Sequence, residues 1–278
     1  MRNLYKIEQV SKYATRHRLM FDGLIEDHSK LAAFLGDPDF PHILYNASQG
    51  EKILRYQELY REYSRLGLSE PYDRPTAIDG LQQRLLRTMR VSGGFGVFDE
   101  GVTRSLLRRS LLWRRGIDTP SLSRIHFPPQ SVVSTVPSWS WMAYTGGIDY
   151  LQPDFGCYEW EDLQSPWSPK TPTNVSSTDY NLANIALEAI AREYDLGAAV
   201  QGEGELIFDT PNGSAKPDTL CVVLGKAKGS PSLGTQRHYI LMIAAQRGRA
   251  GSRVYERVGT GFLPGKCISP SGFKVKIQ

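Results

Sequence analysis

Apolar residues recur every three or four positions over the first part of the chain, as on one face of an α-helix. In the segment 51–66, which has no proline or glycine, this stripe consists of Ile53, Tyr56, Leu59, Tyr60 and Tyr63. The spacing predicts an amphipathic helix. We expect Gly67 to end it, because glycine readily adopts the left-handed conformation that closes helices.

Three further helices are predicted in this part of the chain. Residues 5–22 mix apolar residues with Lys and Arg and contain neither proline nor glycine. Another helix is expected after Asp73, which stands at the capping position with Pro75 in the first turn. The last covers about 99–113, and the glycine-rich stretch 92–96 separates it from the helix before.

Past Pro120 the helical spacing fades, and proline, glycine, serine and aromatic residues become frequent. Trp139 and Trp141 alternate with Ser138 and Ser140, which predicts a strand with both indoles on one face. Glycine and proline separate the later strand candidates at short intervals, which indicates antiparallel pairing. These candidates are 185–191, 204–208, 220–224, 238–245 and 251–258.

Together these elements predict an α+β fold, with an N-terminal helical half followed by an antiparallel β-rich half. The expected regions are 1–120, mainly helical, and 121–278, β-rich and packed on the first. A single composite domain is the alternative. The chain has 278 residues, 40% apolar and 22% charged, which is ordinary for a folded protein with a substantial core.

Net charge and cysteine content limit the classes of partner and the cellular compartment to be expected. A formal net charge of +4 over the whole chain gives little support for a polyanionic partner. Cys157, Cys221 and Cys267 lie far apart and form no CxxC pair, which argues against a disulfide framework or a zinc site. The sequence contains no secretory signal pattern and no run of about eighteen apolar residues. We expect a cytoplasmic protein with no membrane span.

An arginine cluster at 104–115 is one candidate for a functional surface. Arg104, Arg108, Arg109 and Arg115 could form a basic surface for nucleic acid or an acidic partner, because guanidinium groups suit phosphates. The alternative is the solvated face of an amphipathic helix. We favour that alternative because no nucleic-acid-binding motif accompanies the cluster, so nucleic acid is not the expected partner.

The aromatic residues between positions 139 and 167 are the second candidate. Trp139, Trp141 and Tyr144 could line a pocket for a small molecule, because aromatic walls with polar tips suit stacking. A core between the sheet and the helices is the alternative. We favour the core, since tryptophan and tyrosine pack well in half-buried strands.

No sequence pattern indicates a catalytic or cofactor site. The glycine stretches 92–96 and 259–261 lack the context of a phosphate-binding loop, so we interpret them as turns. The five histidines include no pair at helical ligand spacing and no HExxH motif, and no GxSxG elbow anchors a triad. We therefore assign no catalytic residue, no cofactor and no metal.

Four short motifs occur in order between positions 55 and 265. They are Tyr60-Arg61-Glu62-Tyr63-Ser64 with Asp73-Arg74-Pro75-Thr76-Ala77-Ile78-Asp79-Gly80, Gly94-Phe95-Gly96-Val97-Phe98 with Leu111-Leu112-Trp113, Val136-Pro137-Ser138-Trp139-Ser140-Trp141, and Tyr255-Glu256-Arg257-Val258-Gly259. Together they resemble the region that follows the core of fungal heterokaryon-incompatibility (HET) domain proteins. The third motif is the most distinctive.

The chain also departs from that family. The core elements Leu-Ser-Tyr-x-Trp-Gly and Arg-x-Trp-x-x-Gln-Glu are absent, and Phe98 and Pro75 replace an expected tryptophan and leucine. No activity suggested for the family's core therefore carries over. The resemblance implies a non-catalytic accessory or interaction module in fungal non-self recognition or programmed cell death, with a protein as partner. The alternative is a small-molecule binder, or a cyclase- or isomerase-like enzyme of fungal secondary metabolism, with an aromatic pocket near 139–167.

Overall fold

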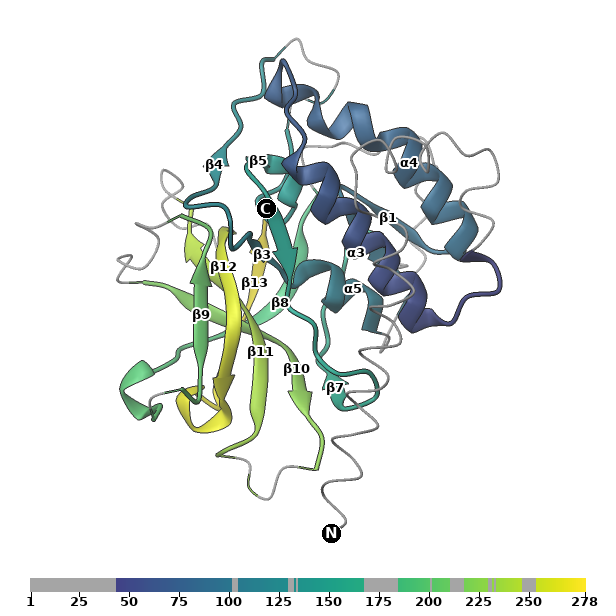
Figure 1. Ribbon diagram of the computed structural model, residues 1–278. Coiled ribbons are helices and arrows are strands. Elements are labelled where there is room, and N and C mark those ends of the chain that lie inside the picture. Colours follow the sequence, from purple (N-terminus) through teal and green to yellow (C-terminus); the bar gives the residue numbers. More distant parts are fainter. Residues whose placement is uncertain are drawn as a thin grey trace, which may run out of the picture. The chain divides into compact units, whose positions relative to one another are not determined.

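Figure 1 shows the computed structural model of the chain. It describes residues 44–101, 105–129, 133, 135–167, 185–200, 202–210, 218–229, 232, 234–246 and 254–278. The chain divides into two compact units, Met1–Ala47 and Ser48–Gln278, and the second holds every helix and strand discussed below. The helix expected at 5–22 lies outside the described residues.

The helix α3 (Gln49–Arg65) confirms the first periodic segment. Ser48 and Glu51 form a capping box at its start, in which each side chain accepts a hydrogen bond from the backbone N–H of the other residue. The helix ends ahead of Gly67, with Leu66 already in an extended conformation. Its apolar stripe is buried, as the spacing predicted.

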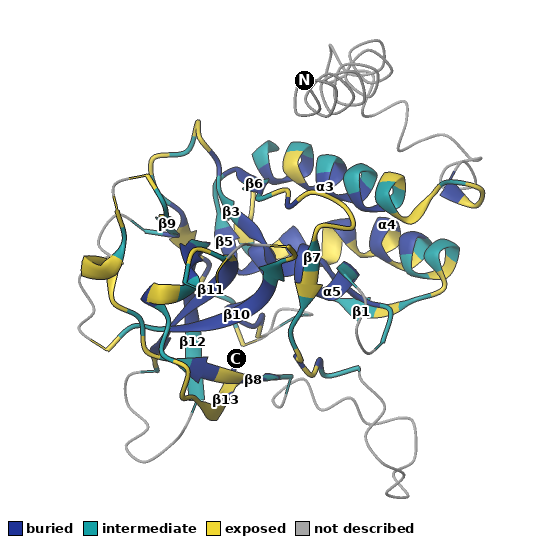
Figure 2. Cartoon of the chain, turned by 90° about the horizontal axis from the view of Figure 1, so that it is seen from below, coloured by how far each residue is buried: buried dark blue, intermediate teal, exposed yellow. Residues whose placement is uncertain are grey.

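The helix α4 (Arg74–Met89) follows a single 3-10 turn, η2 (Pro71–Asp73). Asp73 stands at its N-terminal cap as expected, but the side chain makes no capping hydrogen bond. At the other end Arg90 closes the helix with a left-handed backbone, φ 55°. Figure 2 shows buried and exposed residues alternating along α3 and α4, as expected for helices that cover a core.

The helix α5 (Ser105–Leu111) is shorter than the segment predicted at about 99–113, because short strands flank it. The hairpin of β1 (Ser92–Gly94) and β2 (Val97–Asp99) precedes it. The strand β3 (Trp113–Arg115) follows it and pairs with β6 (Ile148–Tyr150). A further short pair joins β4 (Ser123–Arg124) to β5 (Tyr144–Thr145).

The larger sheet has seven strands and includes the five that the sequence predicted after residue 185. Their bounds are β7 (Tyr158–Trp160), β8 (Leu187–Arg192), β9 (Glu205–Phe208), β10 (Leu220–Ala227), β11 (Arg237–Ala245), β12 (Val254–Pro264) and β13 (Phe273–Ile277). The order is β11-β10-β8-β13-β12-β9, with β7 on β10. Because β11 also pairs with β12, five of these strands close into a ring. The pairings between the described strands are antiparallel except for β12 with β13.

Both faces of β10 and β11 are buried, which separates the core into two clusters. Val222, Leu224 and Leu241 pack with residues of β8, β13 and α5. Cys221, Val223, Ile240 and Met242 pack on the opposite face, with β12 and the 3-10 turn η7 (Gly265–Cys267). The turn η5 (Leu196–Ala198) lies beside η7. Alternation along these two strands therefore separates two interiors, not an interior from solvent.

The segment around the tryptophan pair is not the strand that its alternation predicted. Residues 137–140 form a turn, closed by a 3.0 Å hydrogen bond from Ser140 N–H to the Pro137 carbonyl. The 3-10 helix η3 (Trp141–Ala143) follows. The indoles and the intervening serines are all buried. The alternation of tryptophan and serine therefore does not separate a buried face from an exposed face, as it would in a strand at the surface. The α+β class is confirmed, with the described helices ahead of the larger sheet.

Candidate functional site

The three aromatic residues considered for a ligand pocket lie inside the core. Trp139 and Trp141 are fully buried and Tyr144 is 6% exposed. The centroid of the Trp141 ring lies 5.2 Å from that of Tyr60 on α3, and Trp139 lies 6.2 Å from Phe95 in the hairpin. Tyr144 packs against a further tryptophan. Among the described residues, other aromatic rings pack against all three side chains.

The two serines beside the indoles bind distant backbone segments. Ser138 Oγ accepts a hydrogen bond of 2.9 Å from the Arg257 backbone N–H and donates to the Gln278 carbonyl. Ser140 Oγ donates to the Phe95 carbonyl at 2.7 Å and caps η3. The segment therefore joins β12, the end of β13 and the β1–β2 hairpin.

A buried ion pair completes this region. Arg257 on β12 and Asp209 after β9 are each 2% exposed and share two hydrogen bonds, of 3.0 Å from Nε and 3.2 Å from Nη2. The guanidinium also donates to the carbonyls of Leu111, at 2.8 Å, and Trp113, and it lies 3.2 Å from the Trp113 ring centroid. A buried charge needs such compensation, because its desolvation costs several kcal/mol.

The four motifs noted in the sequence thus meet in one core. Tyr60 and Tyr63 of the first motif pack on Trp141, and the guanidinium of Arg74 lies 5.8 Å from the Trp141 ring. Gly96 of the second motif lies so close to the Trp141 indole that a Cβ there would overlap it. The fourth motif contributes Arg257. Residues of all four motifs therefore contribute to one packed core.

The indole N–H groups are not equally satisfied. Trp113 Nε1 donates to the Trp139 carbonyl at 2.8 Å. Within the described part of the chain, the Nε1 atoms of Trp139 and Trp141 have no hydrogen-bond partner. Each such group costs about 1–3 kcal/mol, whereas burying a large apolar side chain contributes a similar or larger amount. Ring packing therefore holds the pair in place.

Arg108 and Arg109 are 1% and 2% exposed, so for these two residues both the possible basic surface and the solvated helix face that we favoured are wrong. Arg108 donates to the Glu161 carbonyl at 3.0 Å. The Arg109 guanidinium lies 4.1 Å from the Phe155 ring centroid and 5.2 Å from that of Trp160. Residues 106–111 of the short α5 are all buried, so its arginines reach across the interior to carbonyls and rings.

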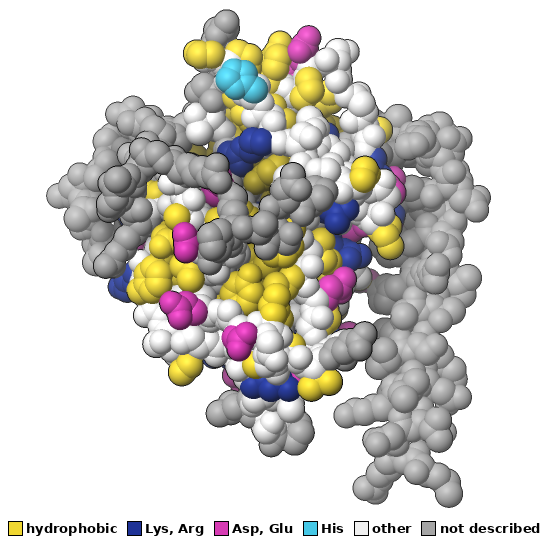
Figure 3. Space-filling view, turned by 90° about the vertical axis from the view of Figure 1, so that its left-hand side faces the viewer, with side chains coloured by type: hydrophobic (Ala, Val, Ile, Leu, Met, Phe, Trp, Pro, Cys, Tyr) yellow, Lys and Arg dark blue, Asp and Glu magenta, His cyan; other side chains and the backbone are white. Residues whose placement is uncertain are grey.

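The other two arginines of the cluster are Arg115 and Arg104. Arg115 is half-buried and donates to the carbonyls of Thr119, at 2.6 Å, and Pro120, at 3.0 Å. Arg104 lies outside the described residues. On the face shown in Figure 3, basic, acidic and hydrophobic side chains are interspersed. The arginine cluster therefore serves mainly to satisfy backbone groups where the structure describes it.

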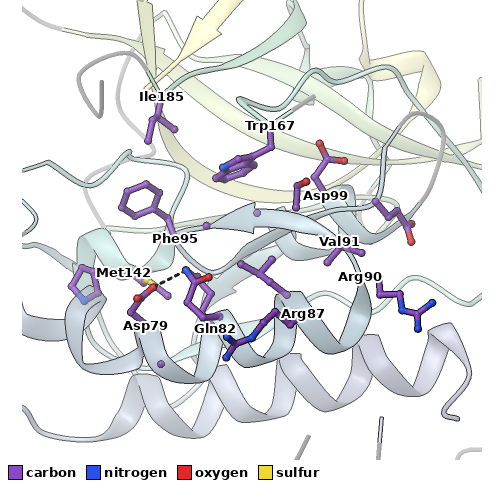
Figure 4. Close-up of a pocket in the computed structure, with 18 of the residues that line it drawn as sticks. Asp79, Gln82, Arg87, Arg90, Val91, Phe95, Asp99, Met142, Trp167 and Ile185 are labelled. Atoms are coloured by element: carbon purple, nitrogen blue, oxygen red, sulfur yellow. Dashed lines mark hydrogen bonds between the residues drawn. The ribbon is translucent and has the colours of Figure 1, made fainter. Parts of the chain in front are cut away.

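A groove of about 1150 Å³ lies between α4 and the β1–β2 hairpin (Figure 4). One wall is the exposed polar stripe of α4, which consists of Thr76, Asp79, Gln83, Arg87 and Arg90. The hairpin crosses the middle, and the opposite wall holds Phe95, Trp167 and Ile185. The Trp167 ring packs edge-on against Trp139 at 6.0 Å, so this wall rests directly on the core.

Hydrogen bonds hold the carboxylates of the groove. Asp99 is buried and accepts from Ser165 Oγ and, at 2.8 Å, from the Gly101 N–H. Glu100 accepts from the Leu106 N–H at 2.9 Å, at the start of α5. The contact of Glu100 links the residue after β2 to the first turn of α5. On the other wall Asp79 accepts from the Gln83 side chain at 3.2 Å, the dashed line in Figure 4.

The turn of the hairpin is strained. Its two residues, Phe95 and Gly96, have φ of 52° and 76°, the pattern of a type I′ turn. A left-handed conformation costs a phenylalanine about 1–2 kcal/mol. Gln82 on α4 accepts from the Gly96 N–H at 2.7 Å, and Trp139 packs on the Phe95 ring. Contacts with the helix and the core therefore hold the turn at the end of the groove.

Burial shifts the pKa values of several titratable groups in the core. It raises the pKa of Tyr60 well above 10, and Tyr56 and Asp79 raise it further. It raises the pKa of Tyr144 to about 12, with a further contribution from Asp209. Burial lowers the pKa of Arg74 from its ordinary value of 12.5. Both phenols stay neutral at physiological pH and serve as packing groups.

The sequence did not reveal this groove. The stretch 92–96 was expected to be a turn, which is right for Phe95 and Gly96, but Ser92–Gly94 is a strand. Trp167 and Asp99 are far apart in sequence, so no local pattern links them. The one available signal was the exposed polar stripe of α4 shortly before a Gly-Gly pair.

Among the described residues, no group of three or more His, Cys, Asp or Glu side chains is placed to hold a metal ion. None of the described helices is both long and apolar enough to cross a membrane. Comparison of the chain with protein-family models, curated proteins and solved structures found no match.

Proposed function

We propose that this chain is a non-catalytic, HET-like interaction module of fungal non-self recognition or programmed cell death, and that it binds a partner protein at the groove beside α4. One observation carries the proposal. The four motifs behind the resemblance contact one another around Trp139 and Trp141. Their common role is then to build a rigid core, and the groove that rests on this core is the surface left for binding.

We place this function in the cytoplasm. Cys157, Cys221 and Cys267 form no disulfide, which suits a reducing compartment. The groove also suits a protein partner, because one wall is polar and the other is mainly aromatic. Such a mixture provides both contact area and hydrogen bonds.

Expression of the chain in a filamentous fungus tests the proposal. We expect the wild-type chain to slow growth or reduce viability, and the double variant Asp79→Arg, Arg87→Glu to lose most of that effect. The double variant reverses the charges on the α4 wall and leaves the net charge unchanged. Arg84→Glu is the control, because Arg84 lies on α4 but does not line the groove. An inert wild-type chain, or equal effects of all three chains, would contradict the proposal.

The second candidate is a small-molecule binder or a cyclase- or isomerase-like enzyme of fungal secondary metabolism. It is favoured by the buried Asp99 in the same groove as Trp167 and Phe95, since a carboxylate beside aromatic walls can orient an apolar ligand. An NMR screen of aromatic fragments tests it. Binding that Asp99→Asn weakens, in a variant of unchanged melting temperature, would support this candidate. A screen without hits at the groove would remove it.

A further inference from the structure

One edge of the hairpin presents its backbone to the groove. In the register of β1 and β2, Gly93 lies opposite Phe98. The Phe98 N–H donates to Ser110 Oγ at 3.2 Å, and the Phe98 carbonyl lies 3.5 Å from the same hydroxyl. Both groups of Phe98 therefore face α5. In an antiparallel pair, opposite residues turn their polar groups either both inward or both outward. The N–H and C=O of Gly93 thus point away from β2, from the other edge of β1.

That edge lies in the middle of the groove, between its two walls (Figure 4). A Cβ at Gly93 would overlap the Val97 carbonyl and lie 3.0 Å from Leu86 of α4, and one at Gly94 would lie 2.9 Å from the Trp167 ring. Glycines are therefore required for the walls to approach so closely. Within the described part of the chain, no strand pairs with this edge.

A polypeptide is the ligand that fits an open edge between two walls. An added strand would take the hydrogen bonds of Gly93, and its side chains would alternate between α4 and the aromatic wall. The aromatic wall of Phe95, Trp167 and Ile185 suits apolar residues. The α4 wall presents the exposed Arg87, which suits a carboxylate.

We propose that β1 binds an extended segment of a partner protein as an added strand, with apolar side chains on Trp167 and a carboxylate toward Arg87. This inference rests on the proposed function, because it names the chemistry of the partner at the same groove. The strand β1 has three residues, so it spans about 10 Å and would bind a correspondingly short segment.

The test uses the full chain and a labelled heptapeptide of alternating valine and glutamate. Its matched control carries a single N-methyl group on the central amide, which removes one strand hydrogen bond and leaves every side chain in place. We expect the unmodified peptide to shift the Gly93 amide in NMR spectra and to slow its hydrogen exchange. N-methylation should weaken binding about tenfold.

A second experiment reverses the charge of Arg87. Arg87→Glu should weaken binding of the valine–glutamate peptide about tenfold and favour a valine–lysine peptide, whereas Arg84→Glu should change neither. The inference is overturned if no alternating peptide binds, if the N-methylated peptide binds equally well, or if the Gly93 amide is unaffected. If the peptide binds as expected but the chain has no effect in the fungus, the strand site stands and the proposed function fails.

Discussion

His238 shows how burial of one side chain can couple this fold to pH. It lies on β11 with 7% of its surface exposed, and its Nδ1 is 2.8 Å from the Gln236 carbonyl. Burial lowers the pKa of His238 from its ordinary 6.5, the bond to Gln236 opposes this shift, and Lys226 adds to it. The folded state therefore favours the neutral imidazole more than the unfolded state does.

We expect the free energy of unfolding to decrease as the pH falls below about 6.5, because the unfolded chain takes up the His238 proton first. The contribution of His238 is fully present above that pH and is lost as the pH falls through the lower pKa of the folded state. Urea denaturation at about pH 7.5 and about pH 5.5 measures it. His238→Gln should reduce the difference between the two pH values, while His126→Gln, at an exposed histidine, should leave it unchanged. Equal pH dependence in the wild type and His238→Gln would contradict this account.

At the residue scale, the sequence predicted burial well for apolar side chains and poorly for arginines. The stripe that includes Ile53 and Leu59 is buried because helical spacing directs it to one side. Arg108 and Arg109 occupy positions that a longer amphipathic helix would expose. Their burial depends on carbonyls and rings from the segment 154–163, which no local pattern connects with α5.

At the scale of elements, the β1–β2 turn sets backbone strain against ring packing. Replacing Phe95 by glycine would relieve about 1–2 kcal/mol of left-handed strain. It would also remove the half-buried ring, worth about half of the roughly 1.5–3 kcal/mol of a fully buried side chain, and the contact with Trp139, worth about 0.5–1.5 kcal/mol. Packing therefore outweighs strain.

We expect Phe95→Gly to lower the free energy of unfolding by about 1 kcal/mol. Phe95→Ala should lower it by about 1 kcal/mol more, because alanine loses the ring and keeps the strained Cβ. Denaturation followed by tryptophan fluorescence measures both variants. A glycine variant more stable than the wild type would mean that the ring contributes less than the strain costs.

Long elements were predictable and short ones were not. The helices α3 and α4 each extend over several turns, so their periodicity is clear. The strands β1, β2 and β3 have three residues each, too few to establish a period of two. Around Trp139 the apparent alternation comes from packing on both sides of a turn. The candidate groove combines the long helix α4 with the short strand β1 and with Trp167 and Ile185 from distant segments, which is why the sequence did not locate it.

At the scale of the whole molecule, the pair of Arg257 and Asp209 links the larger sheet to α5 and β3. We expect Arg257→Met to lower the free energy of unfolding by about 3–5 kcal/mol, because Asp209 would stay buried without a counter-charge. The double variant Arg257→Met, Asp209→Leu should recover much of that loss. Urea denaturation of the wild type, the two single variants and the double variant forms a double-mutant cycle. If the two single losses of unfolding free energy simply add in the double variant, Arg257 and Asp209 are not directly coupled.

The order of strands in the ring could not be predicted either. The five predicted strands have similar apolar composition, so their pairing depends on complementarity across the sheet and not on any one segment. The parallel contact of β12 with β13 has no local signal at all. Fold class follows from composition and period, whereas topology requires contacts between residues far apart in the chain.

The Arg257 guanidinium also bears on how the chain reaches its native state. Its partners come from segments 48 to 146 residues away in the sequence. A partly folded intermediate that buried β12 without Asp209 and α5 would leave the Arg257 guanidinium without a counter-charge in an apolar environment. Such an intermediate is disfavoured, because burial of an unpaired charge is costly. We therefore expect sheet and helices to melt together, with circular dichroism and fluorescence reporting coincident transitions.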